Sequence, residues 1–367
     1  MAKTIPVQNH GTLSYQIEIR ENFQELNHTL SDLGCKGDRK ICIVSDSEVA
    51  KIYIDKLKGI LKPTFENIFS FVFTAGESSK NLSVVEKLYE ELIKNGFDRH
   101  DFLLALGGGV VGDLTGYTAA TYLRGIDFIQ IPTSLLAQVD SSIGGKTGVD
   151  FKQYKNMVGA FYQPKLVYMN LSVLKTLPMR QFSSGIAEIL KHGLIKDRSY
   201  FTWMLQNREA IVALEPSVLE EMIFRSCQIK REVVEKDPTE KGERALLNFG
   251  HTIGHAVERL SDFSLYHGEC VAIGSVAAAF LSWKKGNISE QDFQMISDAF
   301  TAFSLPVSTT GLCAQEILAT TKSDKKMKAG KIQFILLKEP GNAYIYSDLS
   351  DAEILSAIYY ILGEVAE

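Results

Sequence analysis

The segment FLLALGGGVVGD, residues 102–113, decides the fold class. Its first five residues are apolar, as in a buried strand, and three consecutive glycines then lead into a helical pattern. The segment matches G-x-G-x-x-G, in which glycines let the backbone approach a pyrophosphate and the helix N-terminus supplies amide donors. The acid that this motif places roughly 20 residues later is not clear here. A tight strand-to-helix turn without a ligand therefore stays open as a second interpretation of this segment.

Outward from this turn, short apolar runs alternate with longer amphipathic segments, which predicts an α/β domain with a largely parallel sheet. We expect strands over 41–44, 67–73, 102–106 and 128–131, and a helix near 84–95. Ligands of such sheets gather at the carboxyl ends of the strands. Asp46 is the candidate for binding ribose hydroxyls, and Glu77 and Lys80, in a second loop at the same edge, favour a nucleotide. The residues predicted at this edge are Asp46, Glu77, Lys80, Asp113 and Thr133.

After about residue 170 the strand signals fade and long helical patterns take over, for example over 222–235 and 291–303. We therefore predict two domains, an α/β domain over 1–175 and a mostly α-helical domain over 176–367.

Histidines concentrate in the second half of the chain. His251 and His255 are four residues apart, so on a helix they project from one face, and His267 follows after a short connection. Glu188 stands on an otherwise apolar helical segment, where an unpaired carboxylate would be costly. This pattern favours a metal site, and three protein ligands with an open position would make it catalytic. Cys270 is an alternative soft ligand, although a buried thiol is the simpler interpretation.

Several cations lie at short helical or loop spacings from these candidate ligands, although each alone could be a solvated surface charge. They point to a substrate with more than one anionic group. The segment DSSIGGKTG, residues 140–148, lacks the first glycine of a Walker A motif, which disfavours a nucleoside triphosphatase. The cations and their polar neighbours are Lys146, Lys155, Asn156, Lys191, Lys230, Arg244 and Asn248.

Composition excludes several classes of protein. The 367 residues carry a formal net charge of −5, which argues against a surface built to bind nucleic acid or anionic lipid. The five cysteines are widely spaced and form no Cys-x-x-Cys pair, as expected in a reducing cytosol. The start of the chain lacks a signal-peptide core, and no apolar stretch is long enough to span a bilayer. We expect a cytoplasmic protein without a nucleic-acid or membrane partner.

Four longer segments resemble the 3-dehydroquinate synthase family of sugar-phosphate cyclases. They are GGGVVGDLTG (107–116), IPTSLLAQVDSSIGGK (131–146), GIAE (185–188) and LNFGHTIGH (247–255). Because they occur in order along nearly the whole chain, they are far more specific than one short motif. The resemblance implies a Rossmann-like NAD-binding N-terminal domain and a helical C-terminal domain, with the active site in the cleft between them, usually in a homodimer.

The resemblance also implies a role for individual residues. It assigns Zn²⁺, with Co²⁺ as an alternative, to Glu188, His251 and His267, which replaces the helical pair His251 and His255. Implied catalytic residues are Lys146, Lys191, Glu240, Arg244 and His255. Implied substrate contacts are Asp140, Lys155, Asn156, Lys230, Asn248 and Lys326, or Lys325 in its place, and Arg124 from the neighbouring subunit. Implied NAD contacts are Asp46, Glu77, Lys80, Gly108, Gly109, Val110, Asp113, Thr133, Ser134, Asp140, Lys146 and Lys155.

The implied activity is conversion of 3-deoxy-D-arabino-heptulosonate 7-phosphate to 3-dehydroquinate and phosphate, in the shikimate pathway that leads to aromatic amino acids. A sibling cyclase making an inosose or a valiolone is the nearest competing activity, but its substrate lacks the carboxylate that Lys230, Arg244 and Asn248 would bind. A metal-dependent polyol dehydrogenase, which would release NADH, and a non-catalytic nucleotide-binding regulator also stay open. Whether the substrate phosphate or a side chain takes the proton in the elimination is open as well.

Overall fold

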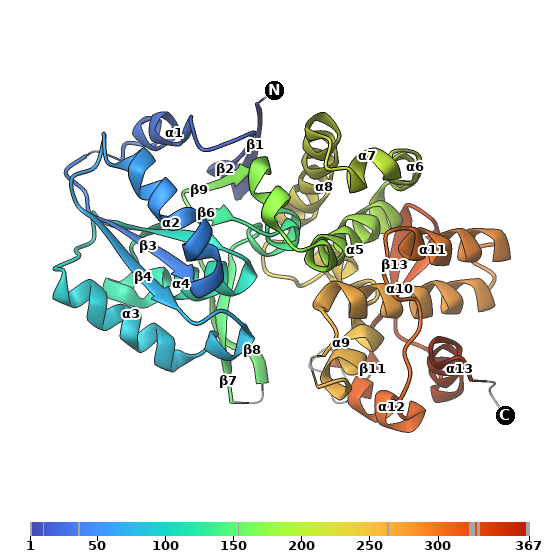
Figure 1. Cartoon of the computed structure of the whole chain (residues 1–367). Helices are drawn as coiled ribbons and strands as arrows, with labels where there is room; N and C mark the ends of the chain where they lie inside the picture. The colour runs from blue at the N-terminus through green and yellow to red at the C-terminus, as the bar shows by residue number, and fades with distance from the viewer. Residues whose placement is uncertain are drawn as a thin grey trace. The chain divides into compact units, whose positions relative to one another are not determined.

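The computed structural model describes residues 2–9, 11–35, 37–152, 154–262, 264–322, 327–328 and 331–364. The chain forms two compact units (Figure 1). The first contains Met1–Leu177 and Leu219–Arg231, and the second contains Pro178–Val218 and Glu232–Glu367. Part of helix α8 (Pro216–Lys236) therefore belongs to the first unit. The single boundary after residue 175 stays a prediction.

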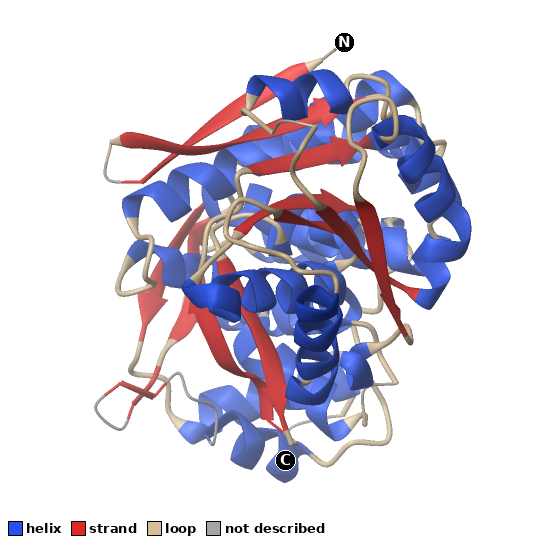
Figure 2. Ribbon diagram, turned by 90° about the vertical axis from the view of Figure 1, so that its left-hand side faces the viewer, coloured by secondary structure: helices blue, strands red, loops and turns tan. Residues whose placement is uncertain are grey.

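The first unit is built on a seven-stranded sheet in the order β1-β2-β9-β6-β5-β3-β4. All neighbouring pairs are parallel except β1 (Lys3–Asn9) with β2 (Thr12–Arg20), an antiparallel pair at one edge (Figure 2). The four predicted strands are confirmed as β3 (Ile41–Asp46), β4 (Ile68–Phe73), β5 (Phe102–Gly107) and β6 (Asp127–Pro132). Strands β1, β2 and β9 (Leu166–Asn170) were not predicted.

Strand β5 lies inside the sheet and all its residues are buried, so its side chains alternate between two apolar cores. Phe102, Leu104 and Leu106 pack into the core that includes Leu57 of α2 (Ser47–Leu61). Leu103 and Ala105 pack into the core that includes residues of α3 (Leu82–Lys94) and α4 (Gly109–Thr121). Burying each leucine contributes about 2 kcal/mol, which explains why this run is apolar throughout.

The predicted nucleotide residues lie where parallel strands end and the next segment begins. Asp46 ends β3 and caps α2, Gly107 ends β5, and Thr133 follows β6. The Thr133 amide donates to the Gly107 carbonyl at 2.9 Å, which joins the ends of two strands. Glu77 begins a short 3-10 helix after β4.

An antiparallel hairpin of β7 (Lys146–Phe151) and β8 (Tyr154–Phe161) carries three of the predicted substrate residues. It extends from the first unit in Figure 1. Asp150 on β7 forms a bridge with Asn81, and its amide donates to the Lys80 carbonyl at 2.8 Å. The hairpin is therefore joined to the loop that precedes α3.

The second unit is mostly helical, and α10 (His267–Lys284) contacts most of its other parts. Its neighbours are α5 (Met179–Lys196), α9 (His251–Leu260), α11 (Glu290–Ala302), α13 (Asp351–Leu362) and β12 (Phe334–Glu339). The helices predicted over 222–235 and 291–303 are confirmed in α8 and α11. The hairpin of β12 and β13 (Asn342–Tyr346) was not predicted. Within the described residues, no helix is long and apolar enough to cross a membrane.

The remaining elements are shorter. The first unit also contains α1 (Leu26–Asp32), and the second contains α6 (Arg198–Gln206), α7 (Arg208–Val212), α12 (Ala314–Lys322), β10 (Met327–Lys328) and β11 (Lys331–Ile332).

Candidate functional site

The glycines of the turn after β5 serve two different purposes. A Cβ on Gly112 would lie 2.5 Å from Oε1 of Gln130, so this glycine allows α4 to pack closely against the sheet. Gly108 is the N-cap of α4 and Gly109 its first residue, and a Cβ there would come no closer than 3.5 Å and 3.1 Å, respectively, to its nearest neighbours. These two glycines leave the amide end of α4 uncovered by their own side chains, as a bound phosphate requires.

Lys80 joins three segments of the first unit. Its Nζ lies 2.7 Å from Oδ2 of Asp113 on α4 and donates to Oδ1 of Asn156 on β8 at 2.6 Å. Burial alone would lower the pKa of Lys80, but the carboxylates of Asp113, Glu77 and Asp150 outweigh that effect and raise it. Lys80 is therefore a buried cation between the glycine turn and the hairpin.

The other predicted nucleotide residues lie in the first unit as follows. Asp46 Oδ1 accepts hydrogen bonds from the amides of Glu48 and Val49, both at 2.9 Å, so it caps α2. Ser134 Oγ accepts from the Ala137 amide at 3.2 Å, as in a helix start. Glu77 is exposed, Thr133 is buried, and Val110 and Ser134 are half-buried.

The predicted substrate residues of the first unit fall into two groups. Lys230 on α8 is buried and donates to both the carboxylate and the carbonyl of Asp140. Lys146 is exposed at the start of β7, and Lys155 and Asn156 stand on β8.

Arg124 is exposed and follows Leu123 with both residues at positive φ, 68° and 50°. Two consecutive left-handed residues other than glycine are strained, and such strain gathers at functional sites.

In the second unit, a carboxylate and two imidazoles converge. Glu188 comes from α5, and His251 and His267 are the first residues of α9 and α10. Oε1 of Glu188 lies 3.5 Å from Nε2 of each histidine, and the three candidate ligand atoms lie within 4.8 Å of one another. Glu188 is fully buried, so its charge needs a partner at this point.

The remaining ring nitrogens of these histidines have partners of their own. Nδ1 of His251 lies 3.1 Å from the Phe249 carbonyl oxygen, and Nδ1 of His267 lies 3.5 Å from Oε2 of Glu258. Such partners commonly orient histidine ligands in metal sites. Two nitrogens and one carboxylate oxygen are also a common ligand set for zinc. The residues present therefore fit a divalent metal ion.

His255 lies beside this cluster, with its ring centroid 5.1 Å from that of His251 and 5.9 Å from that of His267. With Glu258 and His267 it forms a second group of potential ligands. Both groups share His267, whose Nε2 faces Glu188 and whose Nδ1 faces Glu258. We therefore interpret Glu258 as the partner that orients the ring of His267. Neither group contains Cys270, which is buried in α10.

Charges near the cluster are closely coupled. Lys191, one helical turn after Glu188, is buried and donates to Oε2 of Glu188. Burial would lower the pKa of His267, but its contacts with Glu188 and Glu258 outweigh burial and raise the pKa to about 10. The carboxylates thus favour a cation at this position.

The segment before α9 carries three more predicted residues. Asn248 Nδ2 donates to Oε1 of Glu240 at 2.9 Å, and Arg244, which is buried, donates to the Pro238 carbonyl at 2.7 Å. Glu240 has φ of 57°, a left-handed conformation. Lys325 and Lys326 lie outside the described residues.

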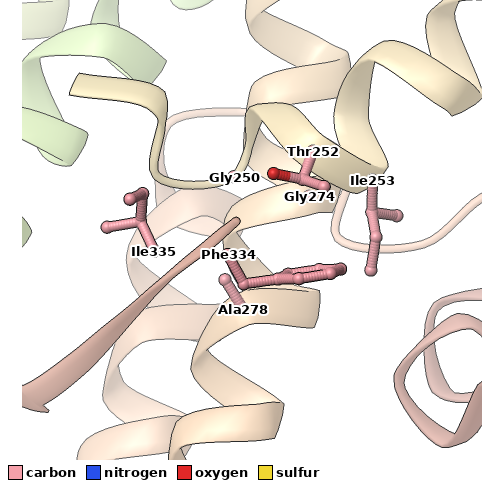
Figure 3. Close-up of a pocket in the computed structure, with 7 residues that line it drawn as sticks. All are labelled: Gly250, Thr252, Ile253, Gly274, Ala278, Phe334 and Ile335. Atoms are coloured by element: carbon pink, nitrogen blue, oxygen red, sulfur yellow. The ribbon is translucent and has the colours of Figure 1, made fainter. Parts of the chain in front are cut away.

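A small cavity adjoins α9 and carries no ionisable group in its lining (Figure 3). Its lining residues are Gly250, Thr252, Ile253, Gly274, Ala278, Phe334 and Ile335. It is a packing gap between α9, α10 and β12, and its lining contains none of Glu188, His251 and His267.

Sequence reasoning missed Glu258, Arg180 and Glu269. Glu258 is seven residues after His251 and therefore on the same side of the helix, which is a signal that the sequence contained. Arg180 on α5 pairs with Glu269 on α10, and no sequence spacing indicates this contact between two helices.

Comparison with family models gives two adjoining matches. Residues 70–184 match the model described as 3-dehydroquinate synthase N-terminal, and residues 185–327 match the model described as 3-dehydroquinate synthase C-terminal.

Individual proteins are similar over nearly the full length. A 3-dehydroquinate synthase from Ruminiclostridium cellulolyticum is 42% identical over 345 residues, 94% of this chain and 95% of that protein. The solved structure of a 2-epi-5-epi-valiolone synthase from Streptomyces hygroscopicus, with NAD⁺ and Zn²⁺ bound, has a TM-score of 0.87 and 28% identity, and the match covers 97% of this chain and 98% of that one. A 2-deoxy-scyllo-inosose synthase with carbaglucose-6-phosphate, NAD⁺ and Co²⁺ shares the fold, with a TM-score of 0.86 and 24% identity over 98% of this chain and 100% of that one.

Proposed function

The chain belongs to the 3-dehydroquinate synthase family and has that lyase activity, and we propose that it uses NAD and a divalent metal ion as cofactors. The substrate is 3-deoxy-D-arabino-heptulosonate 7-phosphate, and the products are 3-dehydroquinate and phosphate. The observation that carries the proposal of a metal-assisted reaction is the meeting of Glu188, His251 and His267, each histidine oriented by a second partner.

The two groups that the chain would bind are NAD, in the first unit, and Zn²⁺ or Co²⁺ at Glu188, His251 and His267. When bound, NAD takes up and returns a hydride, and the metal ion acts as a Lewis acid toward substrate oxygen atoms.

In the first unit, the amide end of α4 at Gly108, Gly109 and Val110 binds the pyrophosphate of the nucleotide. Lys80 supports this through its buried charge and its contact with Asp113. Asp46 and Glu77 contact the ribose hydroxyls, and Thr133 and Ser134 supply polar groups next to the glycine turn. The position of these residues after β3, β4, β5 and β6 supports the assignment.

Cations hold the two anionic groups of the substrate. Lys146, Lys155 and Asn156 lie on one hairpin, and a lysine pair with an amide can bind a phosphate and stabilise the charge it carries on leaving. Lys230, held by Asp140, provides a further cation. In the second unit, Arg244 and Asn248 bind the carboxylate, and Lys326 adds a contact.

The groups that would transfer protons are His255 and Glu240. His255 lies beside His251 and His267, and Glu240 contacts Asn248, so each can hold or pass a proton next to the bound substrate. Lys191 contacts the metal ligand Glu188 directly and fixes its carboxylate. The substrate phosphate is the alternative base for the elimination.

We also propose a homodimer in which Arg124 reaches the active site of the neighbouring subunit. Its exposure and its strained backbone support this. The cytoplasm is the proposed location, and the five cysteines, all free thiols, are consistent with it.

A sibling cyclase that makes an inosose or a valiolone is the main competing function, because one such enzyme shares 28% identity with this chain. Purified protein should be incubated with the heptulosonate phosphate, catalytic NAD⁺ and Zn²⁺, and phosphate and dehydroquinate followed together. Equal release of the two products is expected. Phosphate release only from hexose or heptulose phosphates without a carboxylate would favour the sibling, and stoichiometric NADH would favour a dehydrogenase.

Two variants test the assignment of the residues. His251→Ala should lose both metal and activity, because it removes a ligand. Lys146→Ala should keep the metal and lose turnover, since it binds substrate charge. An active His251→Ala protein without bound metal would overturn the metal site.

A further inference from the structure

Three residues on one side of α5 contact three consecutive residues at the start of α10. Arg180 pairs with Glu269, the Ser184 hydroxyl accepts from the Gly268 amide at 3.0 Å, and Oε1 of Glu188 lies 3.5 Å from Nε2 of His267. Arg180, Ser184 and Glu188 are four residues apart, so they form one row along the helix. This row, which we call the α5 row, ends at a proposed metal ligand.

The contact between Arg180 and Glu269 uses two parallel hydrogen bonds. Nε lies 2.6 Å from Oε1 and Nη2 lies 2.7 Å from Oε2. A planar guanidinium bound in this way fixes the direction of its partner as well as its distance. Glu269 is only 10% exposed, so water competes little for its side of the pair.

Both residues also bind the backbone of the segment just before His267. Oε2 of Glu269 accepts from the Tyr266 amide at 2.8 Å, and Nη2 of Arg180 donates to the Ser264 carbonyl at 3.2 Å. The guanidinium carbon lies 4.4 Å from the centre of the Tyr266 ring. The segment from Ser264 to Glu269 is thus held against α5 at several points.

The two helices touch closely between these contacts. A Cβ on Gly268 would lie 2.0 Å from the carbonyl oxygen of Ser184, so the backbones meet directly. Any change in how the start of α10 lies against α5 therefore changes the position of His267 relative to Glu188.

We propose that Arg180 and Glu269 are positioning residues that hold His267 at the spacing from Glu188 that a divalent metal ion needs. The inference rests on the proposed metal site. An ion pair with a purely structural role would contribute to stability and leave the affinity for metal unchanged.

The test measures metal binding by the metal-free full chain. Arg180→Gln and Glu269→Gln are titrated with Zn²⁺ in competition with a chromophoric chelator, and the visible absorption of the Co²⁺ forms is recorded. Glutamine at 269 can still accept from the Tyr266 amide, so the second variant keeps the helix cap. Arg198→Gln is the matched control, because Arg198 is 55% exposed, against 52% for Arg180, and pairs with Asp292 in the same unit at 3.0 Å.

Both test variants should bind Zn²⁺ about 10-fold more weakly, the lower end of the range for residues that orient metal ligands, and should show an altered Co²⁺ spectrum. The control should match the wild type, and Arg180→Lys should fall between, because lysine makes a single contact. Unchanged affinity and spectrum in both test variants, or an equal loss in Arg198→Gln, would overturn the inference. His251→Ala is run in parallel: if it binds Zn²⁺ like the wild type, the proposed metal site itself fails, and the inference fails with it.

Discussion

Lys80 Nζ lies 2.7 Å from Oδ2 of Asp113, and this pair joins the loop after β4 to the second turn of α4. Both side chains are largely buried, with 6% and 17% exposure. The pair has a structural role, we propose a nucleotide-binding role for it as well, and substitutions can separate the two.

Lys80→Met should destabilise the protein by about 3 kcal/mol, because it leaves the Asp113 carboxylate without its cation in a buried place. The double variant Lys80→Met with Asp113→Leu should recover much of that stability, since no buried charge remains, while NAD affinity stays weak. Urea unfolding and NAD titration measure the two effects. Tight NAD binding by the double variant would show that the pair is structural alone.

Glu258→Gln should weaken Zn²⁺ binding by about 10-fold or more, because the carboxylate near Nδ1 of His267 both orients the ring and raises its basicity. Competition with a chelator measures the affinity. Glu316→Gln, at an exposed position in the first turn of α12, is a control that should leave it unchanged. Equal Zn²⁺ affinity in Glu258→Gln and the wild type would remove Glu258 from the metal site.

Gly268→Ala should destabilise the second unit by about 3 kcal/mol, because the added methyl group would overlap the Ser184 carbonyl, which lies in helical backbone. Gly59→Ala serves as the opposite case. Its Cβ meets open space on α2, so the variant should gain up to about 1 kcal/mol through helix propensity. Thermal unfolding of both proteins tests the pair, and a stable Gly268→Ala protein would show that α5 and α10 separate easily.

Glu353 gives a stability effect that depends on pH. Its contact with Lys285 and its hydrogen bonds from Ser350 lower its pKa from 4.5 to about 2. A carboxyl group whose pKa is lower in the folded state stabilises that state at any pH above its unfolded-state pKa. This stabilisation is lost as the pH falls toward the folded-state pKa. Glu353→Gln should therefore be less stable than the wild type at pH 7, by about 1 kcal/mol at most because the site is exposed. The difference should shrink between pH 5 and pH 2 in urea titrations, and a constant difference would contradict the assignment.

Strands β3, β4, β5 and β6 could be predicted because each is a short apolar run, and β5, which lies inside the sheet, is buried throughout. Strands β1 and β2 could not, because β1 contains Pro6 and both strands mix polar with apolar residues. As an antiparallel edge pair, they need fewer apolar residues than strands inside the sheet.

The proposed metal ligands show a similar limit. The sequence pointed to His251 and His267 through their close spacing, but spacing alone also favoured His255, which is on the same helix face. The family resemblance chose Glu188 instead, whereas the residues alone could not, because that choice requires knowing that α5 packs against α10, a tertiary contact. The pair of Arg180 and Glu269 could not be predicted either, because it too is a contact between α5 and α10. A charged residue at a helix start is usually a surface residue.

Because α9 and α10 begin at His251 and His267, and these rings are 5.4 Å apart, two helix macrodipoles direct their positive ends to one place. Each end is equivalent to roughly half an elementary charge, which the count of charged side chains does not include. The carboxylates of Glu188, Glu258 and Glu269 offset this backbone charge locally. The net charge of −5 therefore leaves out a partial positive charge of the backbone, which these carboxylates offset at this corner of the second unit.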